Sequence, residues 1–287
     1  DSGPGASSGL SLFRIRQDGN GDGVIDEGIG EVDKYNLATV RGGVEYGAKT
    51  ARGLLVANAD LNQKRYSRNS SALGRDNDTF NVLLGVRARL MPKTTFLVDY
   101  EISDTNYKTD PKNGGTADTK DNRILAGITW ENSIQTTGKL RLGQGKRKVD
   151  GGKDIDKFTW DLGMVWKPLP LDTINVSGGA RATDASAPYA ATENTNYNLS
   201  WTHQWLDRVN TTVNFGMSKD DYTVAPNAPA GTKARSDDTT NYGVALNYQM
   251  RRWLVWSVGV NSSDKDSNVK EFSNTRNVMS IGAQVSL

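Results

Sequence analysis

The stretch DTFNVLLGVRARLMPKTTFLVDYEISDTNY, residues 78–107, contains two segments in which apolar and polar side chains alternate. Alternation with period two places successive side chains on opposite faces of a β-strand. One face would carry Phe80, Val82, Leu84, Val86, Phe96, Val98, Tyr100 and Ile102, and the other Asn81, Gly85, Arg87, Arg89, Asp99, Glu101 and Ser103. A turn at residues 91–93 separates the segments, so the stretch predicts a long β-hairpin with one apolar and one charged face.

The length of this hairpin separates two possible folds. A soluble sandwich would bury the apolar face, whereas a membrane barrel would turn that face toward lipid. Strands of globular proteins average about 5–6 residues, and tilted strands of about 9–11 residues span a bilayer. Each arm here has about 10–13 residues, which favours the barrel.

Composition is compatible with that fold. The chain has 287 residues, one His and no Cys, with a formal net charge of +2. The absence of Cys excludes disulfides and Cys-based metal or thiol sites. Its apolar runs are far shorter than the roughly 20 residues of a membrane-spanning helix. The mean hydropathy of −0.59 does not argue against a barrel, because only every second residue of a barrel strand contacts lipid.

The alternating pattern repeats along the chain and predicts about fourteen strands. Besides the two arms of the hairpin, these are 10–16, 34–48, 53–66, 122–131, 137–149, 157–166, 172–183, 194–205, 209–222, 238–249, 253–264 and 273–287. Connections alternate between short ones, such as 206–208, and long ones, such as 223–237. Bacterial outer-membrane barrels show this asymmetry. We therefore predict an all-β fold, a transmembrane up-and-down antiparallel β-barrel with short periplasmic turns and long extracellular loops.

Aromatic residues gather near the predicted strand ends. Trp130, Trp166, Trp201, Trp205, Trp253 and Trp256 lie near short turns, and Tyr66, Tyr107 and Tyr222 near long loops. Amphipathic rings prefer membrane interfaces, so we expect two aromatic girdles. A sandwich core would instead place these rings in the middle of strands.

Several segments resemble a known family. They include MPKTTFLVDYEISDTNY, DNRILAGITWENSIQTTGKLRLGQGKRKVD, KFTWDLGMVWKPLPLDTINVSGGARATD, NYNLSWTHQWLDRVNTTV and NYQMRRWLVWSVGVNSSDKDSN. Together they are similar to the putative beta-barrel porin 2 family of outer-membrane barrels, which is often associated with exopolysaccharide operons. The likeness covers roughly residues 80–287 and implies a role in moving polysaccharide across the outer membrane. It assigns no functional residue.

The two ends of the chain are expected to differ. Residues 1–9 are rich in Gly and Ser and predict a flexible lead, with the barrel over 10–287. No cleavable signal peptide is present, so for an exported barrel we expect the mature form or a replaced leader. The last residues, Ser280–Leu287, are similar to the C-terminal assembly signal of bacterial barrels, but end in Leu rather than the usual Phe.

The polar face predicts a moderately basic lumen. Its expected cations are Arg14, Arg16, Arg41, Lys64, Arg87, Arg89, Arg123, Lys139, Arg141, Arg147 and Arg181, and its anions Glu45, Asp60, Asp99, Glu101, Glu131 and Asp161. Two basic ladders, Arg87/Arg89 and Lys139/Arg141, would face water. Fixed lumen charge biases which polymers enter a pore, which favours anionic glycans. The alternative is that arginine–carboxylate pairs only brace the wall.

A segment near the N-terminus resembles the start of a calcium loop. Asp18, Asn20, Asp22, Val24 and Asp26 occupy ligand positions of an EF-hand-like pattern, but Ile29 stands where the bidentate Glu belongs. Calcium requires six to eight oxygens, and Glu27 or Glu31 would have to substitute in the 18–31 loop. An Asp/Gly-rich turn without metal is the alternative, and we expect no cofactor to be required.

Catalysis is not predicted. His203 is the only histidine, and its parity places it on the apolar face between Trp201 and Trp205. Asp99 and Glu101 share one face, about 7 Å apart by strand rise, as many carboxylates in barrel walls do. No nucleotide fingerprint or nucleic-acid module is present, so neither enzymatic activity nor nucleic-acid binding is expected.

We therefore expect a porin-like conduit in the bacterial outer membrane, with both termini in the periplasm. Its cargo would be a secreted, acidic exopolysaccharide. Expected partners are outer-membrane lipids, lipopolysaccharide, polysaccharide and a periplasmic export protein. A general diffusion porin for small solutes and a plugged structural or assembly-forming barrel are the alternatives.

Overall fold

A computed structural model describes residues 35–47, 52–66, 76–109, 116–131, 135–185, 188–225 and 228–286. These residues form thirteen β-strands and one short 3-10 helix, η3 (Lys270–Phe272). The strands are β1 (Tyr35–Tyr46), β2 (Gly53–Tyr66), β3 (Asn77–Met91), β4 (Thr94–Tyr107), β5 (Thr119–Trp130), β6 (Thr136–Val149), β7 (Ile155–Trp166), β8 (Asp172–Asp184), β9 (Tyr189–Leu206), β10 (Val209–Val224), β11 (Arg235–Arg251), β12 (Leu254–Ser267) and β13 (Asn274–Val285).

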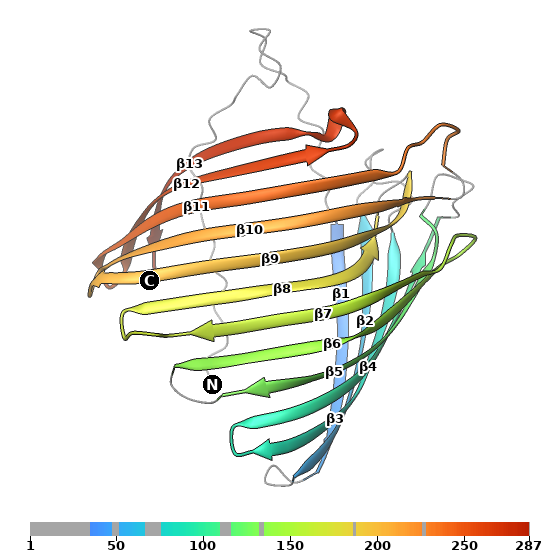
Figure 1. Cartoon of the computed structure of the whole chain (residues 1–287), viewed down its shortest axis with the longest axis horizontal. Helices are drawn as coiled ribbons and strands as arrows, with labels where there is room; N and C mark the ends of the chain where they lie inside the picture. The colour runs from blue at the N-terminus through green and yellow to red at the C-terminus, as the bar shows by residue number, and fades with distance from the viewer. Residues whose placement is uncertain are drawn as a thin grey trace.

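All thirteen strands belong to one antiparallel sheet in which each strand pairs with its neighbours in the sequence. The sheet curls so that β1 and β2 pass behind β6 and β7 in the view of Figure 1. Short connections, such as residues 207–208 between β9 and β10, lie at one end. At the other end the connections range from residues 185–188, between β8 and β9, to residues 225–234, between β10 and β11, so the expected alternation of short and long connections is wrong at β8–β9. Within the described residues β1 pairs only with β2 and β13 only with β12. The predicted up-and-down barrel fold is confirmed, as a curled sheet with two edges.

Several strands extend further into the long-connection end than the sequence pattern indicates. Residues 184–193 were expected to form a loop, yet β9 begins at Tyr189. The reason is a small apolar cluster, in which Ala190 and Ala191 pack with Val149 of β6 and Ile155 of β7. Burial of these side chains stabilises paired backbone where the sequence shows no clear alternation.

Three expectations lie outside the described residues. These are the flexible lead over 1–9, the first strand over 10–16 and the calcium loop that contains Asp18, Asn20, Asp22, Val24 and Asp26. The strand over 10–16 would be the fourteenth and would make the number even. All three stay predictions, as does the division of the chain at residue 10.

The two faces of the sheet differ as the alternation predicts. Large apolar side chains cover one face and remain solvent-exposed in the isolated chain, for example Val40 at 73% and Ile281 at 80%. So much exposed apolar area on one face is typical of a lipid-facing surface. Within the described residues, no helix is both long and apolar enough to cross a membrane.

The aromatic girdle is confirmed at one end of the sheet and is wrong at the other. Trp130 and Trp166 end β5 and β7 next to short connections. Tyr66, Tyr107 and Tyr222 do lie near long connections, but the register places them on the polar face. Tyr66 pairs with Tyr35 beside Lys64, and Tyr222 pairs with Arg235. Strand parity, which the ends of strands obey as strictly as their centres, turns these rings inward.

His203 lies on the apolar face near the short-connection end, as predicted. Its Nδ1 is 2.8 Å from Asp172 Oδ1, and Trp201 Nε1 donates a hydrogen bond of 2.8 Å to the same oxygen. The ring of Trp205 packs edge-on against the imidazole at 4.3 Å. This group of polar-tipped rings suits a membrane interface.

Candidate functional site

The polar face is the concave face of the sheet. Side chains from strands that are not neighbours meet on it: Arg141 of β6 contacts Asp99 of β4, and Arg147 of β6 contacts Asp184 of β8. Side chains converge in this way on the inside of a curved sheet and diverge on the outside. The concave face therefore forms the wall of the barrel interior and is the candidate functional site.

One part of this wall is an ionic cluster on β3–β7. The cluster consists of Arg87, Asp99, Glu101, Arg123, Arg141 and Asp161. The Asp99 side chain is fully buried, with Oδ1 2.5 Å from Arg87 Nη1 and Oδ2 3.0 Å from Arg141 Nη1. The contact with Arg87 is between charges and lacks the alignment of a hydrogen bond. The buried carboxylate is thus compensated by two guanidinium groups.

Arg141 is the centre of the cluster. It also places Nη1 2.6 Å from Glu101 Oε1 and Nε 2.7 Å from Asp161 Oδ2. Arg123 Nη2 lies 3.0 Å from Glu101 Oε2. Three guanidinium groups therefore face three carboxylates, and the formal charge of the cluster is zero.

Glycines on adjacent strands allow this cluster to lie flat against the sheet. Gly127 pairs with Arg141 in register, and a Cβ at Gly127 would lie 2.9 Å from Arg141 Cγ. A Cβ at Gly85 would lie 2.7 Å from both Arg87 Nη1 and Asp99 Oδ1. Leu97 and Leu125, on the same face, are only 1% exposed. The wall is therefore closely packed here.

A second ionic group lies toward the long-connection end of the same strands. Arg147 has a side chain only 3% exposed, and its Nη1 is 2.6 Å from Asp121 Oδ2. Its Nη2 contacts Asp184 and donates a 3.2 Å hydrogen bond to Thr119 Oγ1. This group joins β5, β6 and β8.

Of the predicted lumen cations, Arg14 and Arg16 lie outside the described residues, and the strand register places the others on the concave face; Lys64 pairs with Leu37. Their positions are given by the pairs of Arg41 with Asp60, Arg87 with Leu97, Arg89 with Thr95, Arg123 with Gly145, Lys139 with Gly163, Arg141 with Asp161, Arg147 with Asp121 and Arg181 with Asn194. Arg87 and Arg141 are already ion-paired, so each predicted basic ladder contains one neutralised arginine. In the part of the chain that the structure describes, Lys139 and Arg181 have no carboxylate at ion-pairing distance.

The concave face of β8–β13 has a different chemistry. It contains a trough of about 600 Å³. Its polar lining residues are Asn175, Ser177, Asn198, Ser200, Asn214, Asn241, Asn261, Ser262, Ser263, Asn274 and Arg276. Amides and hydroxyls dominate this lining, and Arg276 is its one charged side chain. The asparagines are exposed, so this part of the wall is hollow and, apart from Arg276, uncharged.

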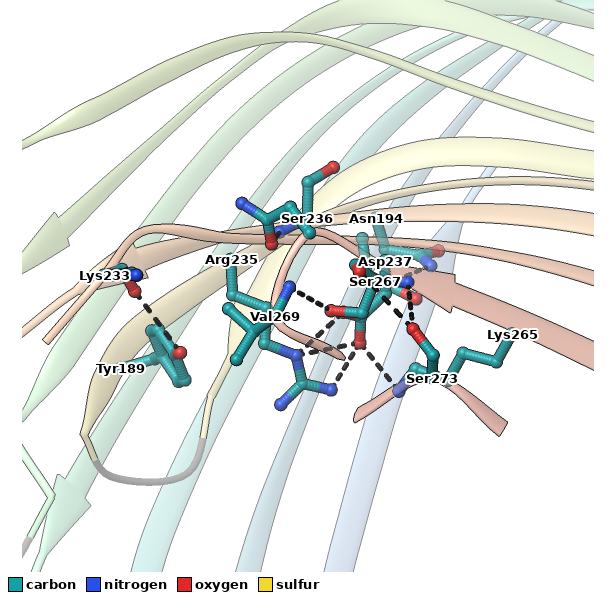
Figure 2. Close-up of polar contacts among 12 residues, drawn as sticks. Tyr189, Asn194, Lys233, Arg235, Ser236, Asp237, Lys265, Ser267, Val269 and Ser273 are labelled. Carbon is teal, nitrogen blue, oxygen red and sulfur yellow. Dashed lines mark hydrogen bonds and ion pairs between the residues drawn. The ribbon is translucent and has the colours of Figure 1, made fainter. Parts of the chain in front are cut away.

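A third charged group lies where β10–β12 meet the long connections. Asp237 is fully buried, and Arg235 and Lys265 both contact its carboxylate, Lys265 Nζ at 2.7 Å. The guanidinium carbon of Arg235 lies 3.6 Å from the centre of the Phe272 ring and 4.4 Å from that of Tyr222. Figure 2 shows Arg235 and Lys265 converging on Asp237, with Ser267 and Ser273 beside it. This mouth cluster ties η3 to the sheet.

Sequence reasoning did not identify the trough or the mouth cluster. The alternation Asn196, Asn198, Ser200 was visible in β9, but asparagines on a polar face carry no charge signal. Asp237 was assigned to a loop. The register across several strands brings these residues together, and this register cannot be read from the sequence.

No metal site is indicated within the described ranges, where no three His, Asp or Glu side chains gather as ligands. The one histidine, His203, faces outward, and its Nδ1 lies 2.8 Å from Asp172 Oδ1.

Comparison with known proteins supports a porin-like barrel. The family described as Putative beta-barrel porin 2 matches residues 9–287. No curated protein matches the chain. Among solved structures, the outer membrane channel DcaP of Acinetobacter baumannii aligns over 89% of this chain and 97% of its own, with a TM-score of 0.52 and 13% identity.

Longer barrels align as well. The FrpB iron transporter from Neisseria meningitidis aligns over 80% of this chain and 44% of its own, with a TM-score of 0.50 and 14% identity. FpvAI, in its complex with pyocin S2, aligns over 88% of this chain and 44% of its own, with a TM-score of 0.52 and 12% identity. The chain thus spans less than half the length of these two proteins, and the likeness concerns the fold.

Proposed function

Because the chain belongs to the Putative beta-barrel porin 2 family, we propose that it is a passive conduit that carries secreted polysaccharide across the outer membrane. That the chain is a porin-like outer-membrane barrel follows from its family. The identity of the cargo is what we propose here. The observation that carries the proposal is the concave wall, which is mostly polar and includes a trough of about 600 Å³ lined by amides, hydroxyls and Arg276. Amide, hydroxyl and charged groups are the chemistry that solvates a sugar chain.

The size of the sheet supports a passage. About eight strands make a barrel whose interior side chains fill it. Thirteen described strands, with the predicted strand over 10–16, make a wider interior. The cargo would diffuse or be threaded through this interior without bond chemistry. A periplasmic export partner would dock near the short connections and supply the driving force, with both termini in the periplasm and lipopolysaccharide around the barrel.

Preference for an acidic polysaccharide would rest on few residues. The ionic cluster is neutral as a whole, so its arginines add little to the field in the lumen. Lys139, exposed Arg181 and, at the trough, Arg276 supply positive charge without an ion-paired carboxylate among the described residues. A few uncompensated cations in a narrow wet passage bias entry toward anions.

The experiment is single-channel recording of the refolded protein in planar bilayers, with and without an acidic oligosaccharide such as hexagalacturonate. We expect stable conductance, a preference for anions, and transient blocks whose frequency rises with oligosaccharide concentration. Conductance without any oligosaccharide block would contradict the proposed cargo and identify a general diffusion porin. Protein shown to be folded but without conductance would contradict the open conduit and leave a plugged structural barrel.

A further inference from the structure

The trough is built as two adjacent rows of short polar side chains. One row crosses the sheet through Ser177, Asn198, Gly216, Asn241, Ser263 and Arg276, and the next through Asn175, Ser200, Asn214, Gly243, Asn261 and Val278. Neighbouring strands are about 4.8 Å apart, so each row presents polar side chains at this spacing except at its glycine and, in the second row, at Val278. Within these rows asparagines alternate with glycine or serine.

The two glycines make the trough hollow. A Cβ at Gly243 would lie 2.0 Å from Asn261 Oδ1, and one at Gly216 would lie 3.0 Å from Asn198 Oδ1. Asn261 and Asn198 therefore lean over the glycine of the adjacent strand, where any larger residue would push them away. Both glycines are buried beneath these amides.

The amides of the trough are available to a ligand. Among the described residues, Asn175, Asn214, Asn241 and Asn261 make no side-chain hydrogen bond, and all four are exposed. A primary amide offers two donors and one acceptor with two lone pairs, which matches adjacent sugar hydroxyls that both donate and accept. Neither row contains a carboxylate. The wall of β3–β7 differs, because there the polar atoms are consumed by internal ion pairs.

From this geometry we propose that the trough is a binding subsite for uncharged, hydroxyl-rich sugar units of the transported polymer. The inference rests on the proposed conduit function and adds where and by which groups the cargo is held. Uncharged units contact the asparagine rows, and Arg276 at the edge meets any acidic substituent. Many weak, exchangeable hydrogen bonds hold a polymer near the wall without trapping it.

The test measures channel block by neutral maltohexaose and by acidic hexagalacturonate in the same bilayers. The variant replaces Asn214, Asn241 and Asn261 with Ala together. Since a hydrogen bond is worth about fivefold in affinity, we expect the apparent dissociation constant for maltohexaose to rise at least about tenfold. Open-channel conductance should stay within about twofold, because truncation of exposed residues leaves the wall polar.

The matched control is Asn58→Ala. Asn58 of β2 also leans over a glycine, with its Oδ1 2.2 Å from a Cβ built at Gly43, and is exposed outside the trough. The apparent dissociation constant for maltohexaose should be the same in Asn58→Ala as in the unmodified chain. Heat-modifiable electrophoretic migration checks that every variant is folded.

The outcomes separate the two proposals. If hexagalacturonate blocks but maltohexaose does not, or if the triple variant matches Asn58→Ala, the subsite is overturned while the conduit stands. If neither oligosaccharide blocks the conducting, unmodified protein, the cargo itself is wrong and the subsite falls with it.

Discussion

Both halves of the concave wall place glycines opposite long or polar side chains, but the two halves differ in their surface. On β5–β6, Gly127 and Gly145 lie opposite Arg141 and Arg123, and these arginines fold flat into ion pairs beside a hollow of only about 240 Å³. On β8–β13 glycines lie opposite asparagines, which lean over but leave a trough of about 600 Å³. The two halves differ in the length and charge of the side chain beside each glycine. This difference accounts for the closely packed wall on one side and the trough on the other.

The largest expected effect is in the sealed half. Replacing Asp99 with Ala leaves Arg87 without its carboxylate and beside the Arg141 guanidinium, which keeps Glu101 and Asp161. Removing one partner of a buried ion pair costs about 3–5 kcal/mol, so the free energy of unfolding in urea with lipid vesicles should fall by that amount. Asn214→Ala in the hollow half is the control and should change it by less than about 0.5 kcal/mol. Equal effects would break the distinction between the halves.

Substitutions of two glycines, on β6 and β7, test how closely the sealed half is packed. A Cβ at Gly143 of β6 would lie 1.8 Å from the carbonyl oxygen of Ile124, whereas one at Gly163 of β7 meets nothing within 4 Å. Overpacking costs about 1–3 kcal/mol, so Gly143→Ala should be destabilising and Gly163→Ala should not. Urea midpoints of the two variants measure this. A Gly163→Ala variant as unstable as Gly143→Ala would refute the packing of the sealed half.

The mouth cluster lies on strands of the hollow half, but its carboxylate is buried and ion-paired. Arg235→Ala removes an ion pair with buried Asp237 and the stacking on Phe272 and Tyr222. Lys265 still compensates Asp237, so we expect a loss of about 2 kcal/mol rather than the full cost of an unpaired charge. Lys219→Ala, an exposed residue of β10, serves as the control for unfolding. No loss for Arg235→Ala would mean that the cluster does not hold η3.

The smallest effect is on ion selectivity. Arg181→Gln removes an exposed cation without an ion pair among the described residues, so the reversal potential under a salt gradient should shift by a few millivolts toward cations. Stability should change by less than about 0.5 kcal/mol. A shift of the same size in Lys219→Ala, which lies on the convex side of β10, would show that general charge and not lumen position sets the selectivity.

Strand identity and face were predictable because they depend on local alternation. The hairpin over residues 78–107 and the inward direction of Arg87 and Arg141 follow from period two alone. The inward direction of Tyr66 and Tyr222 follows from the same parity, and the expectation of an outer girdle overlooked it.

What depends on more than one pair of strands was not predictable. Arg141 reaches Asp99 across an intervening strand, and this contact requires both the register and the curvature of the sheet. The asparagine rows require the register of six strands. The extension of β9 to Tyr189 depends on packing of Ala191 against the cluster that includes Val149.

We expect the polar face to line an open, water-filled passage. The chain contains no cysteine, so a single introduced one reports on its own position. We would measure the single-channel current of Asn241→Cys and of Val244→Cys, from the trough and the convex face of β11, during addition of a charged, membrane-impermeant thiosulfonate. A stepwise fall in current for Asn241→Cys alone is the predicted result. A current that changes with Val244→Cys but not with Asn241→Cys would contradict the account.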